Sequence, residues 1–204
     1  MVKKITIIGN APLSWNFFRV IRLIDSSDIV IRMNLCNNLG RKTGSKIDIL
    51  GLINRGTPAN DLVSKNTKLE NKIKQQLKEI WFSRPSREWE FDTENVKQYH
   101  LPNDVSEEVL IAQELSKTNA SIRYLSVMGF RHLLGIVNGN NVYRYEPSTG
   151  LSIIHMLLSD SLYTSFDKYL IGFTWQGWHG HNWKAEKDYL HSLQDSGVIN
   201  LKYN

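Results

Sequence analysis

The residues best suited to chemistry lie in one short stretch near the carboxyl end of the chain, residues 175–183. It holds three Trp and two His, His179 and His181, among nine residues. An imidazole titrates near neutral pH, so a His here could act as a general base inside a water-excluding aromatic wall that includes Trp178. Aromatic packing under an ordinary loop is the alternative. The two His are only two positions apart and lack a Cys or an evident third ligand, so we predict no metal site.

An acidic residue follows this stretch at a useful distance. On a helix that begins near Asn182, Glu186 would lie about one turn from His181 and could orient its imidazole. Surface His and Glu residues also meet often without any function. The spacing therefore has two interpretations: Glu186 orients the imidazole of His181, or the two are surface residues without a shared function.

A second candidate site is the run Pro147-Ser148-Thr149-Gly150, which precedes an apolar segment. Pro suits the first turn of a helix, and Ser or Thr are good N-caps. Free backbone N–H groups and hydroxyls at a helix start also bind anions. The run predicts either an ordinary capped helix or a helix start that holds a carboxylate or phosphate.

Three asparagines stand where predicted strands end: Asn10, Asn34 and Asn54. Asn is depleted inside strands, so a single Asn at a strand end means little. Three of them after the first three strands indicate a shared polar cleft, because ligands of open parallel sheets bind at the carboxyl ends of the strands. Their amides could bind a base, a ribose or a phosphate without adding charge.

These residues need a scaffold, and hydrophobic patterning predicts one of alternating strands and helices. Short apolar runs predict strands at 5–8, 28–34, 47–53, 80–82, 122–127, 168–173 and 198–201. Helical spacing predicts helices at 14–24, 65–80, 106–116, 130–137, 151–158 and 183–192. We expect an α/β fold, a single Rossmann-like domain over residues 1–204 whose mostly parallel sheet is flanked by helices.

Composition narrows the class of protein and the compartment in which we expect it. The 204 residues are 41% hydrophobic and 22% charged, as in ordinary globular proteins, and no apolar run is long enough to span a bilayer. The chain leads from Met1 straight into a structural strand, so we expect no signal peptide. The one cysteine, Cys36, excludes an internal disulfide and favours the cytoplasm.

The net charge of +5 has two interpretations, a slightly basic surface or attraction to an anionic partner such as a nucleotide, a nucleic acid or a membrane surface. The basic residues are spread along the chain without interleaved aromatics, so we expect no nucleic-acid partner. Peripheral membrane association stays compatible with the charge. The sequence leaves the oligomeric state open.

In their order along the chain, these segments resemble the sialyltransferases, particularly glycosyltransferase family 29. Residues 7–10, 28–34 and 44–48 resemble the large sialyl motif, most closely at Ile31-Arg32-Met33-Asn34. Residues 147–150 are similar to the small motif, residues 181–186 to the very small motif, and Trp178-His179 to the third motif. Asn54 resembles a feature of the bacterial family 42 sialyltransferases. Residues 57–143 are unmatched, and we expect a variable acceptor-side or lid region there.

The resemblance implies a sialyltransferase-like fold, described as a GT-A variant, and an inverting transfer that needs no metal or other cofactor. It implies a CMP-activated sugar acid as donor and a glycan or glycolipid as acceptor, in an enzyme of bacterial or viral type. CMP would lie against Asn10, Asn34 and Asn54. Ser148, Thr149 and Gly150 would hold the donor carboxylate or CMP. His181 would be the general base, and His179 or Trp178 would face the leaving phosphate.

Several functions stay open at this point. The first is transfer of sialic acid or a related nonulosonic acid to a glycan hydroxyl. The second is transfer from CMP-Kdo by an enzyme of the same fold. The third is a nucleotide-binding or glycan-binding module without catalysis, and nucleic-acid binding through the net charge is a fourth.

Overall fold

The computed structural model describes residues 2–12, 17–36, 39–40, 43–54, 71–86, 119–139 and 144–202. The strands are β1 Lys4–Ile8, β2 Ile29–Met33, β3 Ile49–Leu52, β4 Glu79–Phe82, β5 Ser121–Tyr124, β6 Asp167–Ile171 and β7 Asn200–Lys202. The helices are α1 Phe17–Asp25, α3 Asn71–Gln76, α5 Val127–Asn138, α6 Thr149–Ser159 and α7 Trp183–Asp195, with a 3-10 turn, η3, at Ser161–Tyr163.

The strands form one seven-stranded sheet in the order β5-β4-β3-β2-β1-β6-β7, and every pair of neighbours is parallel. The expected α/β fold with a mostly parallel sheet is confirmed. From β1 the chain adds strands in one direction as far as β5, and it then returns to place β6 on the other side of β1. The boundary between β1 and β6 is therefore the switch point of the sheet, where parallel α/β folds bind ligands.

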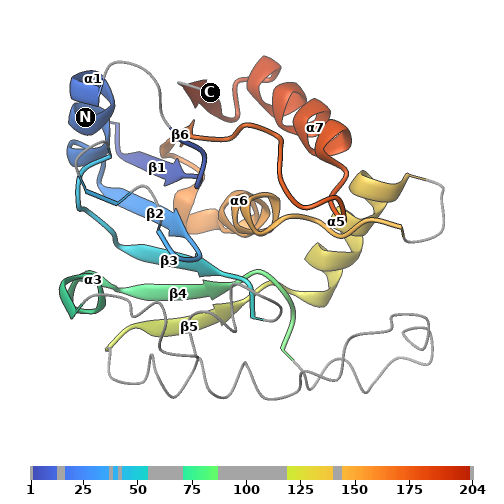
Figure 1. The fold of residues 1–204 in the computed structure, drawn as a ribbon, viewed down its shortest axis with the longest axis horizontal. Helices are drawn as coiled ribbons and strands as arrows, with labels where there is room; N and C mark the ends of the chain where they lie inside the picture. Colours follow the sequence, from blue (N-terminus) through green and yellow to red (C-terminus); the bar gives the residue numbers. More distant parts are fainter. Residues whose placement is uncertain are drawn as a thin grey trace.

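Helices cover both faces of the sheet, so the strands are apolar on both sides. Ile5 and Ile7 of β1 belong to the core that includes α5, α6 and α7. Ile8 packs instead with Val20 and Ile24 of α1 on the opposite face. In Figure 1 the arrows of β1–β5 point towards α5 and α7. The carboxyl ends of the strands therefore face that side of the molecule.

Two predicted boundaries are wrong where α5 begins, and a helix cap explains both. The helix expected at 130–137 starts at Val127. The strand expected at 122–127 ends at Tyr124, because Ser126 is the N-cap of α5 and its hydroxyl accepts a hydrogen bond from the Gly129 N–H at 3.0 Å. Of the helix expected at 65–80, residues 71–80 are described, and only α3 is helical there. The predicted helix end is wrong, because Glu79 and Ile80 belong to β4. The helix expected at 106–116 lies outside the described residues. The assignment of 1–204 to one domain stays a prediction.

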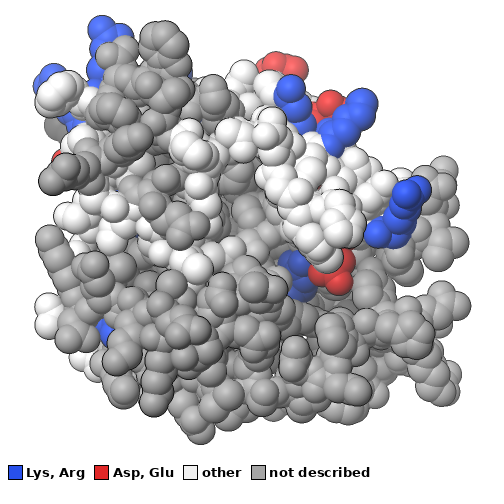
Figure 2. Space-filling view, viewed as in Figure 1, with Lys and Arg blue, Asp and Glu red and all other residues white. Residues whose placement is uncertain are grey.

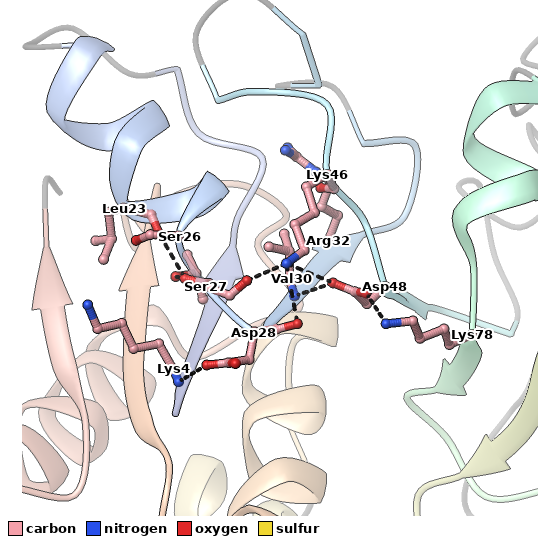
Figure 3. Close-up of polar contacts among 11 residues, drawn as sticks. Lys4, Leu23, Ser26, Ser27, Asp28, Val30, Arg32, Lys46, Asp48 and Lys78 are labelled. Carbon is pink, nitrogen blue, oxygen red and sulfur yellow. Dashed lines mark hydrogen bonds and ion pairs between the residues drawn. The ribbon is translucent and has the colours of Figure 1, made fainter. Parts of the chain in front are cut away.

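The amino ends of the strands are joined by polar side chains (Figure 3). The Asp48 carboxylate accepts a hydrogen bond from the Val30 N–H at 2.9 Å and pairs with Lys78 at 2.7 Å. Arg32 is buried, and its Nε donates to the Lys46 carbonyl at 2.9 Å. These contacts fix the loops at the amino edge of the sheet.

The described surface shows no concentrated basic face in the view of Figure 2. Lys and Arg side chains stand there in separate small groups, with Asp or Glu beside several of them. Within the described ranges, no helix is both long and apolar enough to cross a membrane.

Candidate functional site

The three asparagines lie at one edge of the sheet. Asn10 comes two residues after β1, Asn34 directly after β2 and Asn54 two residues after β3. Because these strands are parallel neighbours, their carboxyl ends meet at the same edge. The shared location is confirmed, and the binding role assigned to these residues stays a prediction.

Asn34 already has a structural task at this edge. Its backbone has a φ of 46°, a left-handed conformation that Asn tolerates better than most residues. Its N–H donates to the Gly51 carbonyl at 2.7 Å, and its side-chain Oδ1 accepts from the Ile53 N–H at 3.0 Å. The Asn34 side chain therefore joins the ends of β2 and β3, and its amide NH₂ is the group left for a ligand.

Asn54 sits deeper, with 4% of its surface exposed. Its Nδ2 donates a long hydrogen bond to the Pro85 carbonyl at 3.5 Å. The Asn54 Oδ1 and the Ser83 Oγ, which follows β4, are buried without a hydrogen-bond partner in the structure. Buried polar atoms are nearly always hydrogen-bonded in native proteins, so this end of the edge has unused capacity for polar contacts.

The switch point between β1 and β6 is closed by two glycines. The Gly9 N–H donates to the Ile171 carbonyl at 2.8 Å, and a Cβ at Gly9 would lie 2.2 Å from the Gly172 carbonyl oxygen. Gly172 has a φ of 74°, in the region that favours glycine. The backbone that carries Asn10 is therefore held tightly against the end of β6.

The run Pro147-Ser148-Thr149-Gly150 forms the start of α6, as predicted. Ser148 is the N-cap, and its hydroxyl accepts from the Leu151 N–H at 3.1 Å. A Cβ at Gly150 would lie 2.9 Å from the ring of Phe173, which follows β6. Close packing at Gly150 therefore brings the helix start to the switch-point side of the sheet.

Glu186 is bound to this helix start and not to the imidazole. One carboxylate oxygen accepts from the Ser148 N–H at 2.8 Å, and the other accepts from the Ser148 hydroxyl at 2.6 Å. The expectation that Glu186 orients His181 is wrong, because both of its oxygens bind Ser148 as α7 packs on the start of α6. Burial raises the pKa of Glu186 to about 6, although the Ser148 bonds and the nearby Arg84 oppose the rise.

His181 is oriented by a backbone carbonyl. Its Nδ1 lies 2.7 Å from the carbonyl oxygen of Glu146. A carbonyl oxygen can only accept, so Nδ1 carries the proton and the neutral ring keeps a lone pair on Nε2. Trp178 and Trp183 meet the imidazole edge to face, each with its ring centroid 4.9 Å away. Burial lowers the pKa of His181, so the ring is neutral at pH 7.

The other two candidate site residues of the aromatic stretch, Trp178 and His179, are exposed to solvent. Trp178 is 55% exposed, and His179 is exposed beside it with the two ring centroids 6.0 Å apart. Some aromatic residues of the stretch therefore pack against His181, while Trp178 and His179 are also exposed at the surface. Trp178 contacts the imidazole of His181 with its ring, although the residue as a whole is exposed.

Arg84 is the residue that sequence reasoning missed. It follows β4 at the same edge and is 2% exposed. Its Nη2 donates to the Glu146 carboxylate at 3.0 Å and to the Pro147 carbonyl at 2.7 Å. The sequence offered only its position as a signal. Arg84 comes two residues after the apolar strand β4, and the carboxyl ends of the strands form the edge that carries the site.

A neutral imidazole with a free Nε2 can accept a proton from a hydroxyl group. The buried Arg84 lies next to the start of α6, where its charge is paired with the Glu146 carboxylate at 3.0 Å. Among the described residues, no group of three or more His, Cys, Asp or Glu is placed to hold a metal ion. The arrangement therefore fits proton transfer at Nε2 of His181.

No family model matches the chain, and the similar proteins differ in kind. The urease operon 23 kDa accessory protein of Rhizobium meliloti (strain 1021) is 27% identical over 183 residues, which cover 86% of this chain and 83% of that protein. A mammalian sialyltransferase, crystallised with Gal-beta-1-3GalNAc-ortho-nitrophenol, matches all of this chain and 70% of its own, with a TM-score of 0.53 and 16% identity. At that identity the likeness establishes a sialyltransferase-like fold.

Proposed function

We propose that this protein is a glycosyltransferase that moves sialic acid, or a related nonulosonic acid, from a CMP-activated donor to a glycan hydroxyl. The observation that carries the proposal is the hydrogen bond from His181 Nδ1 to the Glu146 carbonyl, which leaves Nε2 as a base beside the start of α6. The sialyltransferase-like fold supports it, and that neighbour was crystallised with a glycan acceptor analogue.

In this proposal His181 Nε2 takes the proton of the acceptor hydroxyl. The acceptor oxygen forms a bond to the anomeric carbon as the bond from that carbon to the phosphate oxygen breaks, and the electron pair leaves with CMP. A single displacement of this kind inverts the anomeric centre and requires no metal. Positioned proton transfer typically contributes about 100- to 10,000-fold to a rate.

The nucleotide would lie along the asparagine edge. The Asn34 NH₂, Asn10 and Asn54 are the polar groups there, and the first turn of α6 supplies Thr149 and the Gly150 backbone. Ser148 would act mainly by shaping that turn, because its hydroxyl donates to Glu186 and accepts from Leu151. The exposed Trp178 and His179 would face the leaving phosphate or the acceptor sugar.

The test is to incubate the protein with CMP-Neu5Ac and a panel of galactosides, and to follow the release of CMP. His181→Ala should lower turnover by about 100-fold or more and leave the affinity for CMP nearly unchanged, since the base acts on the acceptor. His179→Ala is the control within the same stretch, with an imidazole exposed to solvent. Full activity of His181→Ala would refute the assigned base.

The same assay separates the other donor. Competition between CMP-Neu5Ac and CMP-Kdo shows which sugar acid the enzyme transfers. Binding of CMP in calorimetry, together with no release of CMP from either donor, would favour a nucleotide-binding or glycan-binding module without catalysis.

A second candidate function is an accessory role for urease, which is favoured by the 27% identical relative from a urease operon. It predicts that the protein restores urease activity in a bacterial strain that lacks its relative. His181→Ala would then leave the restoration intact, because an accessory role does not use the proposed base. Restoration without transfer from any CMP-linked donor would replace the first proposal.

A further inference from the structure

We infer that Arg84 is a positioning residue that sets the tautomer of His181 by holding the Glu146 carbonyl in place. The consequence for catalysis rests on the proposed function, whereas the effect on the tautomer does not. The inference follows from the contacts around residues 146–148, which connect a buried guanidinium to the imidazole.

The Glu146 carbonyl faces His181, and Arg84 binds the Glu146 side chain and the next carbonyl along the chain. Its Nη2 donates to the Glu146 carboxylate at 3.0 Å and to the carbonyl of the next residue, Pro147, at 2.7 Å. The Glu146 N–H donates to the Gly180 carbonyl at 3.0 Å, directly before His181. The Glu146 peptide is therefore fixed between Arg84 and the aromatic stretch, and its carbonyl meets Nδ1 at 2.7 Å.

Arg84 is itself rigidly placed. Its Nη1 donates to its neighbour's carbonyl, that of Ser83, at 3.0 Å and to the Ser152 hydroxyl of α6 at 3.3 Å. Its guanidinium also lies over the ring of Phe130, 5.2 Å from the centroid. A planar guanidinium bonded in several directions cannot be replaced by a lysine ammonium, which is a point charge on a flexible chain.

The carboxylate of Glu186 cannot take over this role. Both of its oxygens are hydrogen-bonded to Ser148. The Glu146 side chain is 31% exposed and would move into water if Arg84 were lost. Its carbonyl would then no longer be held in front of Nδ1, and the neutral imidazole would be free to carry its proton on Nε2, where it cannot act as a base.

The test is the tautomer of His181 read from the two ring ¹⁵N chemical shifts by NMR at a pH where the ring is neutral. The intact protein should show a protonated Nδ1 and an unprotonated Nε2. Arg84→Met and Arg84→Lys should both move protonation towards Nε2, and turnover with the preferred CMP-linked donor should fall by about 10-fold or more. Arg123→Met is the matched control, since Arg123 pairs with Asp160 and Glu79.

Glu146→Gln is the milder second variant if Arg84→Met does not fold, which circular dichroism and thermal unfolding show directly. It removes the charge pair with Arg84 on a partly exposed side chain, and it should shift the tautomer in the same direction. An unprotonated Nδ1 in the intact protein, or an unchanged tautomer in both the Arg84→Lys and Glu146→Gln variants, would overturn the inference. A shifted tautomer in a protein that transfers no sugar acid would support the inference and refute the proposed function.

Discussion

At the scale of single residues, the site is defined by a half-buried imidazole and a buried carboxyl group, whose protonation is set by their surroundings. His181 is kept neutral by burial, and its proton is directed to one ring nitrogen by a backbone carbonyl. Glu186 is 1% exposed, and its pKa is raised from 4.5 to about 6, mainly by burial. The two groups lie close to the same helix start but have different partners, so each can be tested separately.

Glu186 makes a specific contribution to the pH dependence of stability. The folded protein holds the Glu186 proton more tightly than the unfolded chain, so the favourable contribution is complete below about pH 4.5 and is lost as the pH rises through about 6. The free energy of unfolding of the wild type, minus that of Glu186→Gln, should fall by about 2 kcal/mol between pH 4 and pH 7. Denaturant unfolding at several pH values measures it.

Ser192→Ala provides the control for that experiment, because Ser192 is exposed on the same helix, α7, and its hydroxyl does not titrate in this pH range. Its difference from the wild type should stay nearly constant over the same pH range. A constant difference for Glu186→Gln as well would show that the buried carboxyl does not titrate as the structure indicates.

At the scale of elements, the start of α6 joins three parts of the fold. Ser148 caps the helix and binds Glu186 of α7, and Gly150 packs on Phe173 after β6. One hydroxyl therefore serves as the helix cap and as the partner of a buried carboxylate. The structure holds a comparable cap without such a carboxylate at Ser126 of α5.

These two caps make a matched pair of variants. Ser126→Ala should destabilise the protein by about 1 kcal/mol, which is the usual cost of a lost N-cap. Ser148→Ala should cost about 2–4 kcal/mol, because it also removes a hydrogen bond from a buried carboxylate. Chemical denaturation of both variants at pH 7 compares the two losses. Equal losses would mean that Glu186 gains little from the Ser148 hydroxyl.

At the scale of the whole molecule, the two halves of the sheet meet at β1 and β6, and the site is built around that junction. The close approach of Gly9 to the Gly172 carbonyl sets how tightly the halves join. The helix start carrying Ser148 and the edge carrying Asn10 are both attached to this junction. Its packing therefore matters for the fold and for the site together.

Gly9→Ala tests the junction. The new methyl group would meet a backbone carbonyl at 2.2 Å, and we expect a loss of about 2–4 kcal/mol in the free energy of unfolding. Gly135→Ala is the control, since no atom lies within 4 Å of its Cβ position in α5. That change should stabilise the protein by about 0.5–1 kcal/mol through helix propensity. A tolerated Gly9→Ala would show that β1 and β6 can separate without cost.

The sequence was sufficient for the elements whose formation is a local matter. Short apolar runs predicted each of the seven described strands. Ser148 was recognisable as a helix cap because capping involves neighbours three residues apart. The shared edge of Asn10, Asn34 and Asn54 also followed, because parallel strands place their ends on one side. The error at Ser126 came from a cap inside an otherwise strand-like run.

Only the tertiary structure decided which groups meet. His181 and Glu186 are close in sequence, yet each binds a partner from the 146–148 segment, more than 30 positions away. Arg84 reaches the same segment from the end of β4 and carried no local signal beyond its position after a strand. Periodicity records which face of an element is buried. The partner of a buried polar group is determined by how the elements pack, and packing depends on contacts between distant parts of the chain.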